Sequence, residues 1–200
     1  MPMLLRHRDC LAVILAKRDG YTEAHCERVE YLCLELGVRC RLRAKELRLL
    51  RVAARLHDIG KIGIPDRVLL KPGVLDADEF EVMKTHATLG QEICERIPYK
   101  EASTISLFVR HHHEAFDGGG YPDGLSGEQI PLCSRIMSLA DSYDAMRTVR
   151  PYQRARSHEQ VMEVMRNERG NKSDPFLFDR FEELVENAAD PGAPGIFTGQ

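Results

Sequence analysis

The sequence predicts an all-α fold in a single domain. Apolar residues recur with a helical period of about 3.6 along the chain, and no alternating stretch of strand length is flanked by hairpin turns. Hydrophobic residues make up 43% and charged residues 30% of its 200 residues, a composition typical of one globular domain with a sizeable core. We therefore expect one domain over residues 1–190 and a flexible tail over 191–200, where proline and glycine are dense.

Capping and helix-breaking residues set the expected helix boundaries. Thr22 follows Gly20 and suits an N-cap, and Gly37 is expected to end the same helix. Asp76 opens an acidic stretch that favours the first turn of a helix, because the helix dipole is positive there. The expected helices cover residues 4–17, 22–36, 44–57, 76–96, 101–112, 132–147, 158–168 and 175–187.

Residues 116–131 lack a helical pattern and are rich in glycine and proline. A loop of this length is uncommon in a compact domain and usually carries function. Its glycine run, residues 118–120, follows no strand and precedes no Gly-Lys-Ser/Thr, which excludes the common phosphate-binding loops. The loop comes directly after three consecutive histidines, so Glu114 and Asp117 are expected to support those histidines through hydrogen bonds.

Helical phase directs several histidines toward the core. Leu50, Ala54 and His57 lie on one face of their helix because their spacings are four and three. The same argument places three further histidines and one aspartate on the apolar faces of other helices. The inward-facing set comprises His25, His57, His86, His112 and Asp141, and Asp58 directly follows the second of these.

These side chains together indicate a metal centre. A single histidine on an apolar face is more often a hydrogen-bonded core residue than a ligand. A carboxylate on such a face is costly to bury without a partner, so Asp141 needs a metal or a counter-charge. Imidazole and carboxylate donors suit iron, manganese, zinc or nickel. Six donors are enough for two ions with Asp58 between them, which is the common arrangement for hydrolysing phosphate esters.

Charge, hydropathy and cysteine content narrow the functional classes. The net charge of −3 disfavours a general affinity for nucleic-acid polymers. The apolar run at residues 11–16 is too short to span a membrane, and it precedes Lys17 rather than a signal-peptide cleavage site. The six cysteines form no CxxC pattern, which suits free thiols in a reducing compartment. A cytoplasmic protein that does not cross a membrane is expected. A basic cluster that suits a small phosphate ligand follows Asp141 and comprises Arg147, Arg150, Arg154 and Arg156.

Two motifs give the sequence a specific resemblance. His57-Asp58 is followed by IGKIGIP over residues 59–65, and His112-His113-Glu114 is followed by DGGGYP over residues 117–122. The chain closely resembles the HD-GYP family of bacterial cyclic di-GMP phosphodiesterases, a branch of the metal-dependent HD phosphohydrolases. The resemblance covers residues 11–184. It implies an HD-domain helical bundle with a long glycine-rich GYP loop.

The resemblance also implies how the ligands divide between two divalent ions. Iron or manganese is expected first, with zinc or nickel as alternatives. A hydroxide that bridges the ions would attack phosphorus and open cyclic di-GMP to the linear dinucleotide pGpG, with further hydrolysis to GMP left open. His113 enters the ligand set through the resemblance alone. The first ion would take His25, His57, Asp58 and Asp141, and the second would take His86, His112 and His113, with Asp58 bridging.

Catalytic and substrate-binding roles follow from the same resemblance. Asp58 and Lys61 are the implied catalytic residues, and Lys61 would stabilise phosphate charge in the transition state. Tyr121 and Arg150 would contact the dinucleotide, whose guanines and phosphates call for stacking and cationic donors. Asp144, one turn after Asp141, is expected to support a ligand by hydrogen bonding.

The sequence departs from the family pattern at two positions. Some members hold a third metal with a glutamate four residues before the first ligand histidine, and Tyr21 stands there in this chain. We therefore expect two ions. Members often carry a basic residue three positions after the one matching Arg150, where this chain has Gln153. Arg154 or Arg156, which follow it, is expected to take its place.

Other functions are open on sequence alone. One is hydrolysis of another nucleotide, such as cyclic GMP-AMP or a deoxynucleoside triphosphate, because the sequence does not show which base is read. Another is a signalling module that docks a GGDEF-type cyclase and uses its metals structurally. That cyclase, or a second copy of the chain in a homodimer, is the protein partner considered. The complete ligand set favours catalysis, since a decayed enzyme should have lost ligands.

Overall fold

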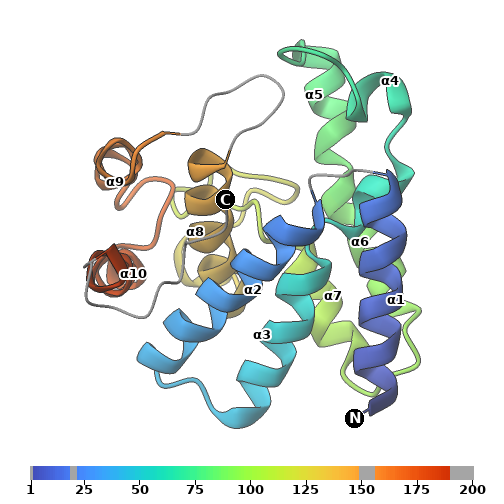
Figure 1. The fold of residues 1–200 in the computed structure, drawn as a ribbon, viewed down its shortest axis with the longest axis horizontal. Coiled ribbons are helices and arrows are strands. Elements are labelled where there is room, and N and C mark those ends of the chain that lie inside the picture. Colours follow the sequence, from blue (N-terminus) through green and yellow to red (C-terminus); the bar gives the residue numbers. More distant parts are fainter. Residues whose placement is uncertain (1, 19–21, 149–155, 190–200) are drawn as a thin grey trace.

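The computed structural model describes residues 2–18, 22–148 and 156–189, and these residues form helices with no strand (Figure 1). The predicted all-α class is therefore confirmed. The α-helices are α1 (Pro2–Arg18), α2 (Thr22–Arg39), α3 (Ala44–Leu56), α4 (Asp66–Leu69), α5 (Ala77–Lys84), α6 (His86–Glu95), α7 (Ala102–Arg110), α8 (Leu132–Arg147), α9 (His158–Asn167) and α10 (Pro175–Ala189), and two short 3-10 helices are η1 (Ile59–Gly63) and η2 (Gly127–Gln129).

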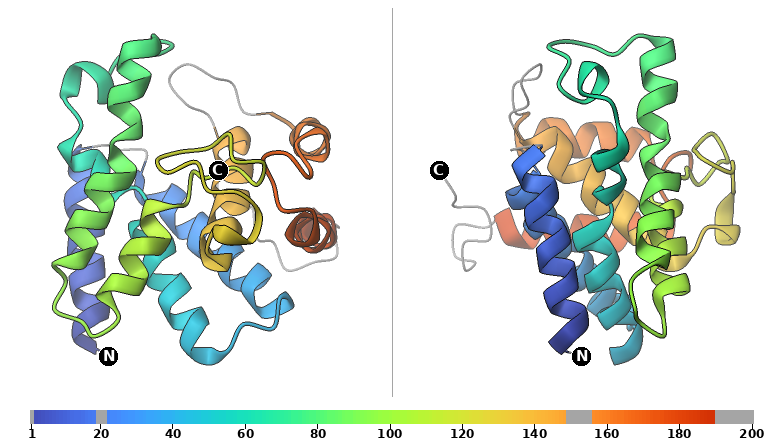
Figure 2. Two further views of the ribbon diagram at one scale, coloured as in Figure 1. Left: turned by 180° about the vertical axis from the view of Figure 1, so that it is seen from behind. Right: turned by 90° about the vertical axis from the view of Figure 1, so that its right-hand side faces the viewer.

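The bundle is built around α2. This helix packs against α3 and α8, while α6 packs against α7 and against η1. Figure 1 shows α9 and α10 beyond α8 at one side of the molecule and α1 at the other. Figure 2 shows α5 standing beyond the rest of the bundle, next to α6. The site described below lies where α2, η1, α6, α7 and α8 approach one another.

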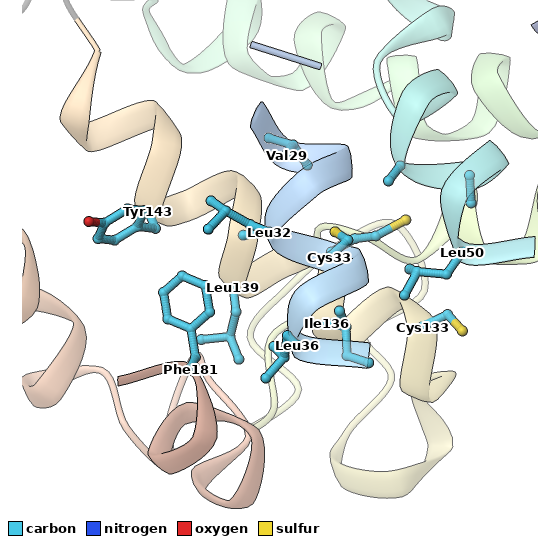
Figure 3. Close-up of a cluster of buried hydrophobic side chains, with 14 of the residues drawn as sticks. Val29, Leu32, Cys33, Leu36, Leu50, Cys133, Ile136, Leu139, Tyr143 and Phe181 are labelled. Carbon is cyan, nitrogen blue, oxygen red and sulfur yellow. The ribbon is translucent and has the colours of Figure 1, made fainter. Parts of the chain in front are cut away.

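A hydrophobic core joins α2, α3, α8 and α10 (Figure 3). Leu36 of α2, Leu50 of α3 and Phe181 of α10 are completely buried, and Tyr143 of α8 packs edge-on against Phe181 with ring centroids 5.3 Å apart. Burying one such side chain stabilises the fold by about 1.5–3 kcal/mol. The core therefore fixes the relative positions of the helices that carry His25, His57 and Asp141.

The helix expected over residues 76–96 is interrupted at Thr85. The Thr85 hydroxyl donates to the carbonyl of Val82 at 2.6 Å, and the Thr85 amide donates to the same carbonyl at 3.2 Å. A threonine that bonds its own backbone in this way competes with the regular helical pattern. The result is two helices, of which α5 contains no buried residue and α6 begins at buried His86.

Two predicted helix ends also differ. The helix α2 continues past Gly37 to Arg39 and ends in a turn where Arg41 has φ 57° and Leu42 N–H donates to the Gly37 carbonyl at 3.0 Å. Turns of this kind, which are closed by two backbone hydrogen bonds, commonly end helices. The residue with positive φ in this turn is Arg41, so the helix ends beyond Gly37, where the sequence predicted its end. The helix α7 ends at Arg110, so the three histidines follow in a turn.

Candidate metal centre

The His57-Asp58 pair lies between α3 and η1, against the start of α6. Its position depends on Gly60, because a Cβ atom there would lie 1.9 Å from the carbonyl oxygen of His86. No side chain fits at that distance. The sequence Asp58-Ile59-Gly60 therefore brings the backbone of η1 directly against the backbone that carries His86.

One group of potential ligands comes from α2, the end of α3 and α8. His25, His57 and Asp141 place one ligand atom each within 4.8 Å of one another. Asp141 Oδ1 lies 3.2 Å from His25 Nε2 and 3.8 Å from His57 Nε2. Both histidines are buried, while Asp141 is slightly exposed.

A second group comes from α6 and the turn after α7. Asp58, His86, His112 and His113 also place ligand atoms within 4.8 Å of one another. The Nε2 atoms of His86 and His112 face each other at 3.4 Å. His113 is the most exposed of these four residues and packs against His112 with ring centroids 4.0 Å apart.

Asp58 stands between the two groups and presents one oxygen to each. Its Oδ1 lies 3.6 Å from His86 Nε2, whereas its Oδ2 lies 3.5 Å from His57 Nε2 and 4.0 Å from His25 Nε2. Lys61, one turn further on, donates to the same Oδ2 at 2.7 Å. A carboxylate in this position has the geometry of a bridge between two cations.

The ligand histidines are held in one orientation by backbone carbonyls. His57 Nδ1–H donates to Ala54 at 2.8 Å, His86 Nδ1–H to Met83 at 2.7 Å, and His112 Nδ1–H to Val109 at 2.5 Å. Such bonds fix the tautomer with the Nε2 lone pair directed at a metal. The Nε2 atom of His57 is buried and has no hydrogen-bond partner. A buried acceptor without a partner is costly, so the donor set fits divalent cations.

In the second group the surroundings keep the three histidines neutral and the Asp58 carboxylate ionised. Burial lowers the pKa of His86 and His112, and burial together with His86 lowers the pKa of His113 to about 3. Burial opposes ionisation of Asp58, but Lys61 and the neighbouring histidines outweigh it and hold its pKa well below the usual value. Neutral imidazoles and ionised carboxylates are the protonation states that bind metals.

His25 is bonded to Asp144, the carboxylate that the sequence analysis expected to support a ligand, and Asp144 is bonded in turn to an arginine that the sequence analysis did not single out. His25 Nδ1–H donates to Asp144 Oδ2 at 2.7 Å. Arg28, one turn along α2, donates to both oxygens of Asp144 at 2.6 and 2.9 Å. Burial lowers the pKa of His25, but hydrogen bonds to Asp141 and Asp144 outweigh it and raise the pKa to about 9.

The glycine-rich loop is organised by Glu114, whose buried carboxylate accepts from the amides of Asp123 and Leu125 at 2.8 and 3.0 Å. Asp123 in turn accepts from Arg110 and His111. Asp117 is exposed, and its carboxylate accepts from the Gly119 amide at 2.8 Å. Glu114 and Asp117 thus bond loop amides, where sequence reasoning expected support of the histidines.

Tyr121, in this loop, lies beside the second ligand group. Its amide donates to the His113 carbonyl at 3.2 Å, and its ring centroid is 4.9 Å from that of His113 and 6.4 Å from that of His86. Gly120 permits this fold, because a Cβ atom there would lie 2.1 Å from the Ala115 amide nitrogen. Burial raises the pKa of Tyr121, so its hydroxyl stays protonated.

Several expected site residues lie outside the described part of the chain. These are Tyr21, Arg150, Gln153 and Arg154, together with the tail expected over 191–200. Of the histidines without a predicted role, His111 bonds Asp123 and His158 bonds the Tyr143 hydroxyl at 2.9 Å. The structure therefore brings together all seven predicted ligands and places Lys61 and Tyr121 beside them.

The fold and this site define an all-α protein with two adjoining groups of histidines and aspartates that could hold metal ions. The HD domain family matches residues 9–177, and the chain belongs to that family. It is 41% identical over 169 residues to the cyclic di-GMP phosphodiesterase response regulator RpfG of Xanthomonas campestris, covering 84% of this chain and 45% of that protein. The predicted resemblance to HD-GYP proteins is confirmed.

A second relative is named for another cyclic dinucleotide, and a solved structure has a similar fold. The chain is 36% identical over 179 residues to the 3′3′-cGAMP-specific phosphodiesterase 2 of Vibrio cholerae, covering 88% of this chain and 34% of that protein. The solved structure of an HDG"Y"P protein from Bdellovibrio bacteriovorus has a TM-score of 0.67 at 18% identity, covering 84% and 53% of the two chains. The chain thus spans less than half the length of these curated relatives. Among the described residues, no helix is long and apolar enough to span a membrane.

Proposed function

We propose that this domain is a metal-dependent phosphodiesterase that hydrolyses cyclic di-GMP to pGpG. The observation that carries the proposal is the position of Asp58, which presents one carboxylate oxygen to each of two groups of histidine and aspartate ligands. Relatives that match most of this chain and are named as cyclic di-GMP phosphodiesterases support the choice of substrate.

We assign two divalent ions to the site, iron or manganese before zinc or nickel, because the donors are nitrogen and oxygen without thiolate. His25, His57 and Asp141 would hold one ion, and His86, His112 and His113 the other, with Asp58 shared. Bound there, the pair would activate water and neutralise charge on the phosphate. The backbone-anchored histidines keep the donor atoms in place, so little reorganisation is needed on binding.

Lys61 and Tyr121 are the described residues that we assign to the substrate. The Lys61 ammonium lies at Asp58 and is largely buried, so it would stabilise negative charge on the phosphate oxygens as the diester is attacked. The Tyr121 hydroxyl stays protonated and can donate a hydrogen bond to the substrate. Arg150 and Arg154 are proposed from sequence alone as further phosphate contacts.

Turnover of cyclic di-GMP by metal-loaded protein tests the proposal. We expect pGpG to appear with iron or manganese, as followed by chromatography, and Asp58→Asn to abolish turnover by removing the shared carboxylate. Glu183→Gln, an exposed substitution on α10, serves as the matched control and should keep full activity. Intact cyclic di-GMP after incubation with either metal would contradict the proposal.

Hydrolysis of 3′3′-cGAMP is the second candidate, because the relative from Vibrio cholerae is named for that substrate. Values of kcat/KM for the two cyclic dinucleotides, measured on one metal-loaded preparation, separate the candidates. The same chromatograms show whether pGpG is converted to GMP. A docking role with a GGDEF-type cyclase or a homodimer is a further proposal, and it requires partner binding that survives Asp58→Asn.

A further inference from the structure

We propose that α5 supplies a binding surface for one purine base and one phosphate of the substrate, through Phe80 and Lys84. This inference rests on the proposed cyclic dinucleotide substrate and extends it to residues that neither the motifs nor the ligand set include. Phe80 and Lys84 are one turn apart on the same face of α5.

Phe80 and Lys84 meet Tyr121 of the glycine-rich loop. The rings of Phe80 and Tyr121 are 6.2 Å apart between centroids and nearly perpendicular, at 83°. The ammonium nitrogen of Lys84 lies 5.6 Å from the Phe80 centroid and 5.8 Å from the Tyr121 centroid. Two aromatic rings and one cation therefore form a single cluster, which we call the aromatic corner.

The aromatic corner adjoins the second ligand group. Tyr121 packs on His113, and His113 lies 5.0 Å from His86 between ring centroids. A line of rings thus runs outward from the ligands through Tyr121 to Phe80. A dinucleotide with one phosphodiester at the ligands extends several ångströms beyond them, which brings a base and the second phosphate to the rings and to Lys84.

The structural role of Phe80 is weak. Its side chain is 48% exposed, and no residue of α5 is buried. The helix is fixed instead by polar contacts, since Asp76 and Glu79 form a capping box and Lys71 contacts Glu79. A half-exposed aromatic ring that contacts Tyr121 is available to stack on a flat base.

Lys84 is available for an anion as well. Its ammonium pairs with Glu81 at 2.6 Å, but the Glu81 side chain is 68% exposed. Exposed ion pairs one turn apart on a helix contribute little, because water and salt screen them. A substrate phosphate with full negative charge can therefore replace Glu81 as the partner of Lys84.

Steady-state kinetics on cyclic di-GMP with Phe80 variants test the aromatic corner. Because stacking needs a flat ring, we expect Phe80→Leu to raise KM about tenfold with kcat and metal content unchanged, and Phe80→Trp to keep KM within about twofold. Lys84→Gln should raise KM about fivefold and reduce its dependence on salt. Leu107→Ala and Lys100→Gln, at exposed positions elsewhere, are the matched controls and should leave KM unchanged.

The outcomes separate this inference from the proposed function. If the wild-type protein hydrolyses cyclic di-GMP and Phe80→Leu has the wild-type KM, the aromatic corner is not a base-binding surface. If Phe80→Leu loses metal or unfolds at a lower temperature, its role is structural and the inference is likewise overturned. If the wild-type protein leaves both cyclic di-GMP and 3′3′-cGAMP intact, the proposed function fails and the aromatic corner fails with it.

Discussion

Asp144 is a buried side chain that fixes the orientation of the candidate metal ligand His25. Its carboxylate accepts a hydrogen bond from His25 and two from Arg28. Burial opposes ionisation of Asp144, but the hydrogen bonds from His25 and Arg28 outweigh it and lower the pKa of the carboxyl. The guanidinium also restricts the orientation of the carboxylate, because it makes two hydrogen bonds rather than one. The His25 ring is therefore held in one rotamer, with Nε2 directed toward Asp141 and Asp58.

Removal of Arg28 should weaken metal binding. We expect Arg28→Ala to lower metal affinity or activity by about 10–100-fold, because hydrogen-bond partners behind metal ligands have effects of this size. Titration of metal-free protein with manganese measures the affinity. Arg166→Ala, which removes an exposed arginine paired with Glu182, is the control and should bind metal normally. Unchanged affinity in Arg28→Ala would show that Asp144 orients His25 unaided.

The low pKa of His113 predicts how the stability of the metal-free protein depends on pH. In the unfolded chain a histidine takes up a proton below about pH 6.5, whereas folded His113 stays neutral down to about pH 3. The free energy of unfolding should therefore fall as pH decreases from 6.5 to 4.5, by about 1.4 kcal/mol per pH unit for this histidine. His86 and His112, whose pKa values are also lowered, act in the same direction.

Urea unfolding of metal-free protein between pH 7 and 4.5 measures this dependence. His25 does not cancel it, because a pKa raised to about 9 gives stability that is complete below about pH 6.5 and is lost progressively as pH rises from 6.5 to 9. The carboxylates, whose pKa values are lowered, lose their contribution only at more acidic pH. His113→Asn should flatten the slope, and a wild-type slope of zero would contradict the assigned neutral state.

At the level of elements, the glycine-rich loop behaves as a preformed part of the site. Glu114 satisfies two loop amides from a buried position, and Asp123 is held by Arg110 and His111. Arg110 and His111 hold the pKa of Asp123 at about 2, although burial opposes this slightly, so the carboxylate stays ionised for its contact with Arg110 down to about pH 2. Tyr121 lies between these anchored positions.

Loss of the Glu114 carboxylate should loosen the loop. We expect Glu114→Ala to lower the free energy of unfolding by about 2 kcal/mol, because two loop amides lose the buried carboxylate that accepts their hydrogen bonds. It should also raise KM for the cyclic dinucleotide more than it lowers metal affinity. Urea unfolding and steady-state kinetics measure the two effects. Glu128→Ala, an exposed glutamate of the same loop, should change neither quantity.

Sequence periodicity could predict the helices and the inward direction of five of the seven ligand candidates, because the apolar faces of the helices determine which side chains are buried. His113 came from the family resemblance alone, and Asp58 from its place directly after His57. It could not predict the break at Thr85, which arises from one local hydrogen bond to Val82. It also missed Arg28, whose partner Asp144 is 116 residues away along the chain. A contact between side chains of two helices depends on how the helices pack against each other. The spacing of residues within one helix does not determine that packing.

At the scale of the whole molecule, the ligands connect parts of the chain that meet only in the folded state. His25 lies on α2, Asp58 follows α3, His86 begins α6, His112 follows α7, and Asp141 lies on α8. Ions bound to all of them favour the folded state because the unfolded chain does not hold the ligands together. Without ions, the buried Nε2 atom of His57 has no hydrogen-bond partner.

Removal of the metals should therefore destabilise the protein. We expect chelation to lower the melting temperature and added manganese or iron to restore it, with a gain of about 2.7 kcal/mol at a free ion concentration of 100 times Kd. Differential scanning calorimetry together with metal analysis, which should give two ions per chain, measures both. Asp58→Asn should abolish most of the shift. A melting temperature that is independent of metal would exclude the assigned sites.

The exposed position of α5 also matters for protein engineering. Residues 77–84 contribute no buried side chain, and the break at Thr85 separates them from the helix that carries His86. Libraries that randomise the outward positions of this segment should therefore cost little stability and leave the metal ligands in place. On the proposed function, directed evolution of selectivity among cyclic dinucleotides is best aimed at this segment, and the metal ligands in the bundle behind it need not change.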